Sequence, residues 1–315
     1  MTTDTQDTVH DGLNPACKVA GIRMIPVLNG KYKVWTKKIG SGKTKVLLLH
    51  GGPGFNHEYF ECFEDFLPPA GFEMYYYDQL GCCNSDLNGE DAADNMSLWT
   101  LPRYLEEVEE VRKGLGLDDF VIVGHSWGGI LAIEYALKHQ HEGHLRAVVV
   151  SNMSASIESF LVCSDKWKRT LSPELLAACE KIEAEEDWEN PLYEKIMMEE
   201  LYPKMCCRIQ PWPEPWNRSL RHVNMKIYAH MQGHSEFVVT GNLKGWDSWA
   251  RLSQIQIPAL MIGAEHDEMD PKDMEKMAQL VAKGTYGYCL GGSHLAFWDS
   301  QEIYFEHLLK FLSSV

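Results

Sequence analysis

The chain has 315 residues, of which 45% are hydrophobic and 23% are charged, and its formal net charge at pH 7 is −16. A chain of this length and composition can bury one large core, or a core with a smaller insertion. The acidic balance argues against a nucleic-acid partner, because phosphate backbones are bound by clusters of Lys and Arg that this sequence lacks.

The sequence predicts a cytoplasmic protein with no membrane partner. No apolar run approaches the roughly 20 residues that a membrane-spanning helix needs. The N-terminal stretch Met-Thr-Thr-Asp-Thr-Gln-Asp lacks the basic and apolar regions of a secretory signal. The nine cysteines are an odd number and include adjacent pairs at 82–83 and 206–207, which favours free thiols, and no CxxC pair indicates a structural zinc site. The oligomeric state stays open.

Strands alternate with helices along most of the chain. The first dozen residues are predicted to be a loose tail. Segments 18–27 and 32–38 flank Asn29-Gly30, which predicts an antiparallel hairpin. A helix over 101–115 has Thr100 as its N-cap and Gly116 after its last turn. Further strands are predicted at 45–50, 72–78, 119–124, 145–150, 258–263 and 285–290, and further helices at 127–139, 272–282 and 301–313.

The alternation is interrupted between about 154 and 247. This stretch has helical patterns rich in Glu, Lys and Met, broken by Gln-Pro-Trp-Pro-Glu-Pro-Trp at 210–216. We interpret 154–247 as an inserted helical cap, and 1–153 together with 248–315 as the core. The alternation on either side predicts a doubly wound, mostly parallel α/β sheet.

A nucleophile elbow is indicated by Gly-His-Ser-Trp-Gly-Gly at 124–129, directly after a predicted strand. Gly124, Ser126 and Gly128 fit the pattern G-x-S-x-G, in which a strained strand-to-helix turn pushes the serine hydroxyl out above the sheet. A serine hydroxyl is a weak nucleophile at neutral pH, so the chain must also supply a base, an orienting group and an oxyanion hole.

A base and an orienting acid follow the serine in the order Ser…Asp…His. Asp267 and His294 both come just after predicted strands, where open α/β sheets place their chemistry. His294 would take the proton of Ser126, and Asp267 would hold the ring in the correct tautomer. In the alternative interpretation, Asp267 caps a helix and Asp270 orients the histidine.

The oxyanion hole needs two backbone N–H groups. One should belong to Trp127, directly after the serine. The other should come from the glycine-rich stretch at 50–54, His-Gly-Gly-Pro-Gly, with Gly51 or Gly52 as the donor.

A histidine-rich stretch at 139–144 has the sequence His-Gln-His-Glu-Gly-His. It lacks the i, i+4 pairing that HExxH uses to bind zinc. We interpret these residues as solvated histidines near the end of a helix.

With these motifs in place, the chain resembles the proline iminopeptidase family of α/β-hydrolases, including the tricorn-interacting aminopeptidase and the L-proline amide hydrolases. The resemblance runs from about Val34 to Leu312 and implies an α/β-hydrolase fold with a helical cap. It also implies cleavage of an N-terminal residue, often proline, with no metal or organic cofactor. The matching stretches are His50-Gly-Gly-Pro-Gly, Asp78-Gln-Leu-Gly, Gly124-His-Ser-Trp-Gly-Gly, residues 263–268 and Gly292-Ser-His-Leu.

The resemblance implies that carboxylates bind the free amine of the substrate. Glu268 matches one such position, and Glu236 resembles a second one on the cap. Two glutamates can make charge-assisted hydrogen bonds to an ammonium group, whereas a blocked amine would leave them unpaired. In the alternative interpretation both are ordinary exposed carboxylates. Tyr228 and Trp212 are candidate pocket residues, although either could simply pack the cap.

One position departs from the family pattern. Members usually have Asp-Gln-x-Gly-x-Gly-x-Ser, whereas residues 78–85 read Asp-Gln-Leu-Gly-Cys-Cys-Asn-Ser, with Cys83 at the second glycine. If the backbone there has a positive φ, Cys83 is strained.

We therefore expect a serine aminopeptidase that acts on a short peptide or an amino-acid amide. A carboxylesterase or an amidase dedicated to one biosynthetic pathway would share the same motifs. Ser126 argues against epoxide hydrolase and haloalkane dehalogenase chemistry, which in this fold uses an aspartate at the elbow. A non-catalytic binding protein is disfavoured, because the serine, the acid and the histidine are all present.

Overall fold

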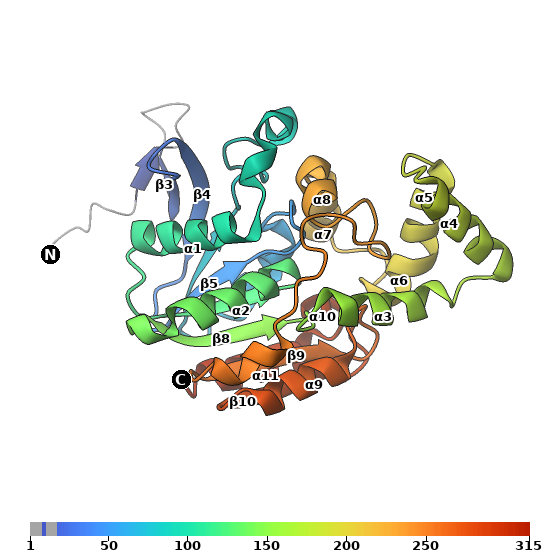
Figure 1. Cartoon of the computed structure of the whole chain (residues 1–315). Coiled ribbons are helices and arrows are strands. Elements are labelled where there is room, and N and C mark those ends of the chain that lie inside the picture. The colour runs from blue at the N-terminus through green and yellow to red at the C-terminus, as the bar shows by residue number, and fades with distance from the viewer. Residues whose placement is uncertain (1–7, 11–17) are drawn as a thin grey trace, which may run out of the picture.

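A sheet of eight strands organises the computed structural model, which describes residues 8–10 and 18–315 (Figure 1). The strand order is β10-β9-β8-β7-β5-β6-β4-β3. The strands from β10 to β6 are parallel, while β4 and β3 continue the sheet antiparallel. Their bounds are Ile22–Val27 (β3), Tyr32–Ile39 (β4), Lys45–Leu49 (β5), Glu73–Tyr77 (β6), Phe120–His125 (β7), Leu145–Ser151 (β8), Ala259–Ala264 (β9) and Gly284–Cys289 (β10).

The predicted hairpin is confirmed, but its first strand is interrupted. β3 and β4 pair antiparallel, and Val27 lies opposite Tyr32. A separate antiparallel pair is formed by Thr8–His10 (β1) and Lys18–Ala20 (β2). Gly21 separates β2 from β3 with a φ of 80°, and a Cβ there would lie 2.3 Å from the carbonyl oxygen of Lys38. The rest of the predicted loose tail lies outside the described residues.

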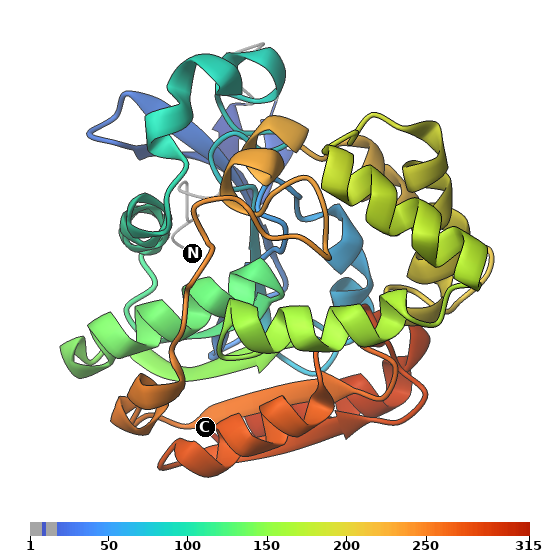
Figure 2. The same cartoon turned by 45° about the vertical axis from the view of Figure 1, so that its right-hand side comes forward.

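Helices cover both faces of the sheet, as the two layers of the core show (Figures 1 and 2). Along β5, Leu47 and Leu49 pack on one face, and Val46 and Leu48 pack on the other. Central strands buried on both faces read as continuous apolar runs, which is why the sequence predicted them well. The first face carries Leu101–Leu115 (α1), Trp127–His139 (α2) and Pro271–Leu280 (α9), and the second carries Glu58–Asp65 (η1), Ala296–Asp299 (α10) and Gln301–Leu312 (α11).

Between β8 and β9 the chain forms an insert of helices, as the sequence predicted. In Figures 1 and 2 the yellow-green helices α4 and α5 lie at the periphery, away from the sheet. Short helices elsewhere span Gly89–Leu98 (η2), Gln140–Glu142 (η3) and Trp249–Gln254 (η5). The insert contains Ile157–Lys168 (α3), Pro173–Glu185 (α4), Pro191–Lys195 (α5), the π-helical turn Ile196–Leu201 (η4), Tyr202–Met205 (α6), Glu214–Arg221 (α7) and Met225–Met231 (α8).

Among the described helices, none combines the length and the apolar character that crossing a bilayer requires.

Helix α1 has the predicted bounds and holds the turn that follows β6. Gly116 ends the helix in the left-handed conformation, with φ 70°. On its inner face, Arg103 and Glu107 form a buried ion pair. Glu107 also accepts a hydrogen bond of 2.9 Å from the backbone N–H of Leu80, and Tyr104 donates one of 3.0 Å to the carbonyl of Leu80. The helix therefore fixes this turn through both the N–H and the carbonyl of Leu80.

Replacing Arg103 by Met is expected to lower the free energy of unfolding by about 3–5 kcal/mol, because Glu107 would keep a buried charge without its partner. Urea unfolding measures this change. Arg169 pairs with Asp165 on the surface, so Arg169→Met is the control and should leave stability nearly unchanged. Equal losses in the two variants would contradict a structural role for the buried pair.

Candidate active site

Ser126 stands at the turn between β7 and α2 in a strained conformation, with φ 54° and ψ −124°. The neighbouring glycines explain the turn. A Cβ on Gly128 would lie 2.0 Å from the carbonyl oxygen of Leu49, and a Cβ on Gly124 would lie 2.0 Å from that of Gly128. Helix α2 therefore starts in direct backbone contact with the ends of β5 and β7, and only glycine allows this approach.

Asp267 and His294 meet at the carboxyl ends of β9 and β10. The Nδ1 atom of His294 lies 2.8 Å from Oδ1 of Asp267, and both side chains are buried. Asp267 also accepts hydrogen bonds from Asn152 Nδ2, at 2.7 Å, and from the backbone N–H of Met269, at 3.1 Å. A carboxylate held in this way fixes the proton of the imidazole on Nδ1 and leaves Nε2 facing the cavity that Ser126 also lines.

Asp270 does not orient His294, as the alternative interpretation had it. Its carboxylate caps α9 by accepting a hydrogen bond of 3.1 Å from the backbone N–H of Lys272, and it pairs with Lys166 at 3.0 Å. Of these two acids, Asp267 is the one that contacts His294.

Asn152 is a residue that the sequence analysis missed. It follows β8 with a φ of 54° and donates to Oδ2 of Asp267, whereas His294 contacts Oδ1. Its position directly after a predicted strand, at the same edge of the sheet as the other polar groups, was the available signal.

Two backbone N–H groups next to Ser126 are free to bind an oxyanion. Gly51 donates its N–H to the hydroxyl of Tyr59 at 2.6 Å, so this group is already used. Within the described chain no hydrogen bond occupies the N–H of Gly52 or of Trp127, the first residue of α2. Of the two glycines considered, the geometry therefore favours Gly52.

Gln79 ties the glycine-rich stretch to the elbow. Its backbone N–H donates to His50 Nε2 at 3.0 Å, and its side-chain amide donates to the carbonyl of His50 at 3.0 Å. The indole N–H of Trp127 donates to Oε1 of the same side chain at 2.8 Å. Burial lowers the pKa of His50 to about 4, so the ring is neutral and can accept at Nε2. The first three matching stretches therefore form one hydrogen-bonded unit.

Glu236 and Glu268 line the same cavity as Ser126 and His294, and one of them contacts the imidazole. Glu268 Oε1 lies 3.3 Å from His294 Nε2. Glu236 accepts a hydrogen bond from the hydroxyl of Tyr228. No Lys or Arg is among the described residues that line this cavity. Its walls are Gly51, Gly52, Phe55, Tyr59, His125, Ser126, Tyr202, Cys206, Trp216, Tyr228, Glu236, Glu268, His294 and Leu295.

A second, mostly apolar pocket also reaches Ser126. It shares Gly52, Ser126 and the two glutamates with the first cavity. Its remaining walls are mostly apolar, so it can take a compact apolar group next to the carboxylates. These walls are Trp127, Ile130, Met153, Ile157, Phe160, Gln232, Leu243 and Met269.

Of the two aromatic residues predicted for the pocket, Tyr228 and Trp212, one lines the cavity. Tyr228 lines the cavity, but among the described residues Trp216 lines it in place of Trp212. Trp212 donates its indole N–H to the carbonyl of Cys207 at 2.9 Å and packs against Trp216. Trp216 stacks on Phe55, with ring centres 5.7 Å apart. Both tryptophans belong to the 210–216 segment, so the sequence located the segment but not the residue.

The buried charges in the cavity are coupled. Burial alone would lower the pKa of His294, but the carboxylates of Glu268 and Asp267 outweigh it and raise the pKa to about 9. Burial raises the pKa of Glu268 to about 8, with His294 opposing the shift and Glu236 adding to it. Burial also raises the pKa of Glu236. All three side chains therefore hold protons more tightly than they would in isolation. The surrounding carboxylates also favour a bound cation.

Among the described residues, two groups of side chains have the atoms and spacing to hold a metal ion, and neither lines the cavity of Ser126. One is Glu58, Cys83 and His222. The other is Glu109, His139 and His144, in which both oxygens of Glu109 already accept hydrogen bonds from the guanidinium of Arg112.

The interpretation of the 139–144 stretch as solvated histidines is wrong for two of its three histidines. His139 and His144 are buried, and only His141 is exposed. Their rings pack against Tyr135, which faces the core from α2. A helix-end pattern cannot show that the ring of His144 stacks on Phe120, at the start of β7.

The fold and the serine site define a hydrolase of the α/β class, and the predicted fold class is confirmed. Residues 44–301 match the family model described as "alpha/beta hydrolase fold". The chain belongs, more narrowly, to the proline iminopeptidase family. It is 46% identical over 298 residues to the proline iminopeptidase of Flavobacterium johnsoniae, covering 93% of this chain and 98% of that protein.

Other relatives support membership of the same family. The proline iminopeptidase of Saccharolobus solfataricus is 33% identical over 301 residues, which cover 94% of this chain and 92% of that protein. The crystal structure of a proline iminopeptidase from Mycobacterium smegmatis matches with a TM-score of 0.82 at 27% identity, covering 93% of this chain and 98% of that one.

Glu268→Gln is expected to lower the pKa of His294, because burial already favours the neutral ring and the variant removes the strongest negative charge that opposes burial. The protonated fraction of His294 at neutral pH should therefore fall. An NMR titration of the imidazole nitrogens measures the pKa directly. Glu236→Gln is the matched control and should lower it less, since Glu236 is the weaker of the two influences. An unchanged pKa in Glu268→Gln would rule out the coupling.

Proposed function

We propose that this protein is a serine aminopeptidase that releases an N-terminal proline, or a small apolar residue, from short peptides or amino-acid amides. One observation carries the proposal: Glu236 and Glu268 face the cavity that holds Ser126 and His294, and no described Lys or Arg lines it to neutralise them. A cavity with this charge suits a substrate ammonium group. Membership of the proline iminopeptidase family supports the same conclusion.

The two carboxylates would place the substrate. A protonated α-amine held between Glu236 and Glu268 would bring the adjacent carbonyl carbon to Ser126, because only one carbon atom separates the amine from that carbonyl. The apolar pocket next to the same two glutamates would take the side chain or the pyrrolidine ring. A chain without a free N-terminus would leave both carboxylates desolvated and unpaired.

The reaction would proceed through an acyl-enzyme. His294 Nε2 takes the proton of Ser126 as Oγ attacks the carbonyl carbon, while Asp267 stabilises the imidazolium through Nδ1. The N–H groups of Gly52 and Trp127 stabilise the negative oxygen. His294 then gives the proton to the leaving amine, and water releases the N-terminal residue by the same steps.

Glu268 would link amine binding to the state of the base. In the free protein it contacts His294 Nε2 and helps to keep this ring protonated, which prevents it from accepting a proton. A substrate ammonium neutralises the charge of Glu268 and adds a positive charge nearby, and both effects lower the pKa of His294. The free amine would therefore help to convert the histidine into its active form.

The insert limits what can reach the site. Tyr202, Trp216, Tyr228 and Glu236 all come from this insert and form walls of the cavity. We propose that residues 154–247 act as a cap that admits short peptides and excludes folded chains. A cytoplasmic location suits the eight described cysteines, all of which are free, because reducing compartments keep thiols unpaired.

Ser126→Ala is expected to abolish turnover without loss of the fold, since a residue that makes the acyl bond cannot be replaced by a methyl group. The assay compares Pro-p-nitroanilide, its N-acetylated form, Ala-p-nitroanilide and p-nitrophenyl acetate, with EDTA present. The unmodified protein should cleave only the two free-amine anilides efficiently. Ser313→Ala, at an exposed serine, is the control. Efficient cleavage of the blocked anilide would instead indicate an esterase or an amidase with another substrate.

Glu236→Gln and Glu268→Gln are expected to reduce kcat/KM for Pro-p-nitroanilide by about 10- to 100-fold, because a hydrogen bond to a charged group contributes about 1.5–3 kcal/mol. Hydrolysis of p-nitrophenyl acetate, which has no amine, should not fall, and in Glu268→Gln it should rise if the lower pKa of His294 frees the base. Glu275→Gln, at an exposed carboxylate, controls for the loss of one negative charge. Equal losses on the anilide and the ester would mean that the glutamates do not bind the ammonium.

A further inference from the structure

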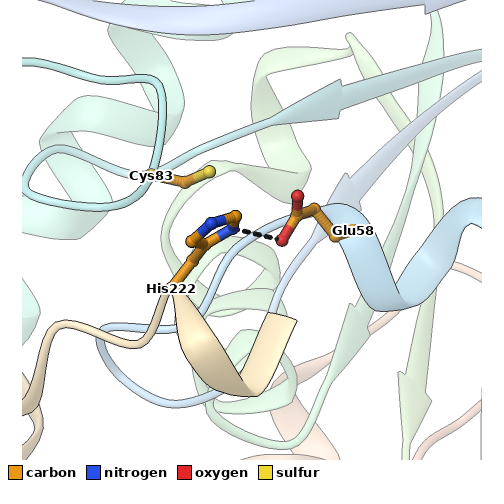
Figure 3. A group of neighbouring side chains, drawn as sticks. All are labelled: Glu58, Cys83 and His222. Atoms are coloured by element: carbon orange, nitrogen blue, oxygen red, sulfur yellow. Dashed lines mark hydrogen bonds and ion pairs between the residues drawn. The ribbon is translucent and has the colours of Figure 1, made fainter. Parts of the chain in front are cut away.

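Three side chains that are far apart in the sequence meet at the junction between the insert and the core (Figure 3). Glu58 is on η1, Cys83 is in the turn after β6, and His222 follows α7 in the insert. One ligand atom of each, a carboxylate oxygen, the sulfur and a ring nitrogen, lies within 4.8 Å of the other two. Figure 3 shows the sulfur of Cys83 directed toward the other two side chains.

The positions of these groups are fixed by the backbone and by other contacts. Cys83 has a φ of 42°, a conformation that favours glycine, so a side chain at this position is retained at some cost in strain. Glu58 is buried, and its Oε1 accepts a hydrogen bond of 2.7 Å from Nε of Arg218. Its Oε2 lies 2.8 Å from Nδ1 of His222. The carboxylate therefore presents one oxygen to the histidine and the cysteine.

The chemistry of the three groups is that of a zinc site. Thiolate, imidazole and carboxylate are all ligands of Zn²⁺, and three protein ligands leave a fourth position for water. The side chain of His222 is 45% exposed, which gives an ion a path from solvent. Burial, followed by the negative charges of Asp78 and Glu58, raises the pKa of the Cys83 thiol, while Arg218 opposes the shift. The same two carboxylates attract a cation.

We propose that Glu58, Cys83 and His222 form a binding site for Zn²⁺ that joins the insert to the core. On binding, the thiol proton of Cys83 is released to solvent, a sulfur–zinc bond forms, and no group is oxidised or reduced. A ring nitrogen of His222 and an oxygen of Glu58 complete the set of protein ligands.

The site lies next to contacts that already hold α7 and the segment after it against the glycine-rich stretch. The backbone N–H of Asn224 donates to the carbonyl of Gly54 at 2.8 Å, and Asn56 donates to the carbonyl of Ser219 at 3.2 Å. Trp216, on the same helix, forms a wall of the cavity that holds Ser126. Bound zinc would therefore restrict the movement of this wall and slow turnover. The effect on turnover rests on the proposed function, whereas zinc binding does not depend on it.

The binding test uses Cd²⁺, which occupies zinc sites and gives an ultraviolet charge-transfer band when thiolate is a ligand. The full, reduced and metal-free chain should show this band at one equivalent, and Zn²⁺ should displace it. Cys83→Gly should lose the band and still fold, because glycine tolerates the positive φ. His222→Asn should weaken binding at least about tenfold. Cys207→Ala and Cys206→Ala, which remove buried thiols outside the group, should keep the band.

A band that persists in Cys83→Gly would overturn the site, whatever the outcome of any activity assay. The effect on turnover is measured separately, as the ratio of Pro-p-nitroanilide hydrolysis with and without Zn²⁺. This ratio should fall in the unmodified protein and change less in Cys83→Gly. Equal inhibition of both would place the inhibitory ion elsewhere, for example at His294 and its carboxylates, and would overturn the link to turnover.

Discussion

The close approach of α2 to the ends of β5 and β7 is the constraint on which the site depends. Gly124 and Gly128 allow backbone atoms to meet where any Cβ would collide. Ser126 is thereby forced into a conformation that costs on the order of 1–3 kcal/mol. Pairing of β7 with strands on both sides, and the hydrogen bond of 3.0 Å from Ser126 N–H to the carbonyl of Ser151, keep the turn from relaxing.

The second determinant is the excess of buried carboxylate around one imidazole. Asp267, Glu268 and Glu236 all act on His294, and the described cavity walls supply no other cation. Such an arrangement is unfavourable for an empty site, because buried negative charges repel one another and lose their hydration. A substrate that carries its own positive charge relieves this repulsion. In the proposed function, recognition of the amine and activation of the base are therefore two results of one electrostatic arrangement.

The insert and the core act on this site together. Glu236 comes from the insert and Glu268 from the core, so the proposed amine site is complete only when both parts are in place. The junction between them combines apolar packing, such as Trp216 on Phe55, with ion pairs that Glu58 makes to Arg218 and His222. Such ion pairs are weaker and easier to rearrange than apolar packing. In the proposed function, this suits an insert that admits substrate and then excludes water. An ion at Cys83 would act at this junction.

The sequence by itself determined the fold class, the bounds of most strands and helices, and the chain order of Ser126, Asp267 and His294. These features follow from local causes: apolar runs in doubly buried strands, glycines at turns, and polar residues at strand ends. Only the tertiary structure decided which of several equivalent groups faces the cavity. Tyr59 uses the N–H of Gly51 and leaves that of Gly52, and Trp216 takes the place expected for Trp212. The grouping of residues 58, 83 and 222, and the burial of His139 and His144, depend on segments that meet only after folding, so no local pattern could show them.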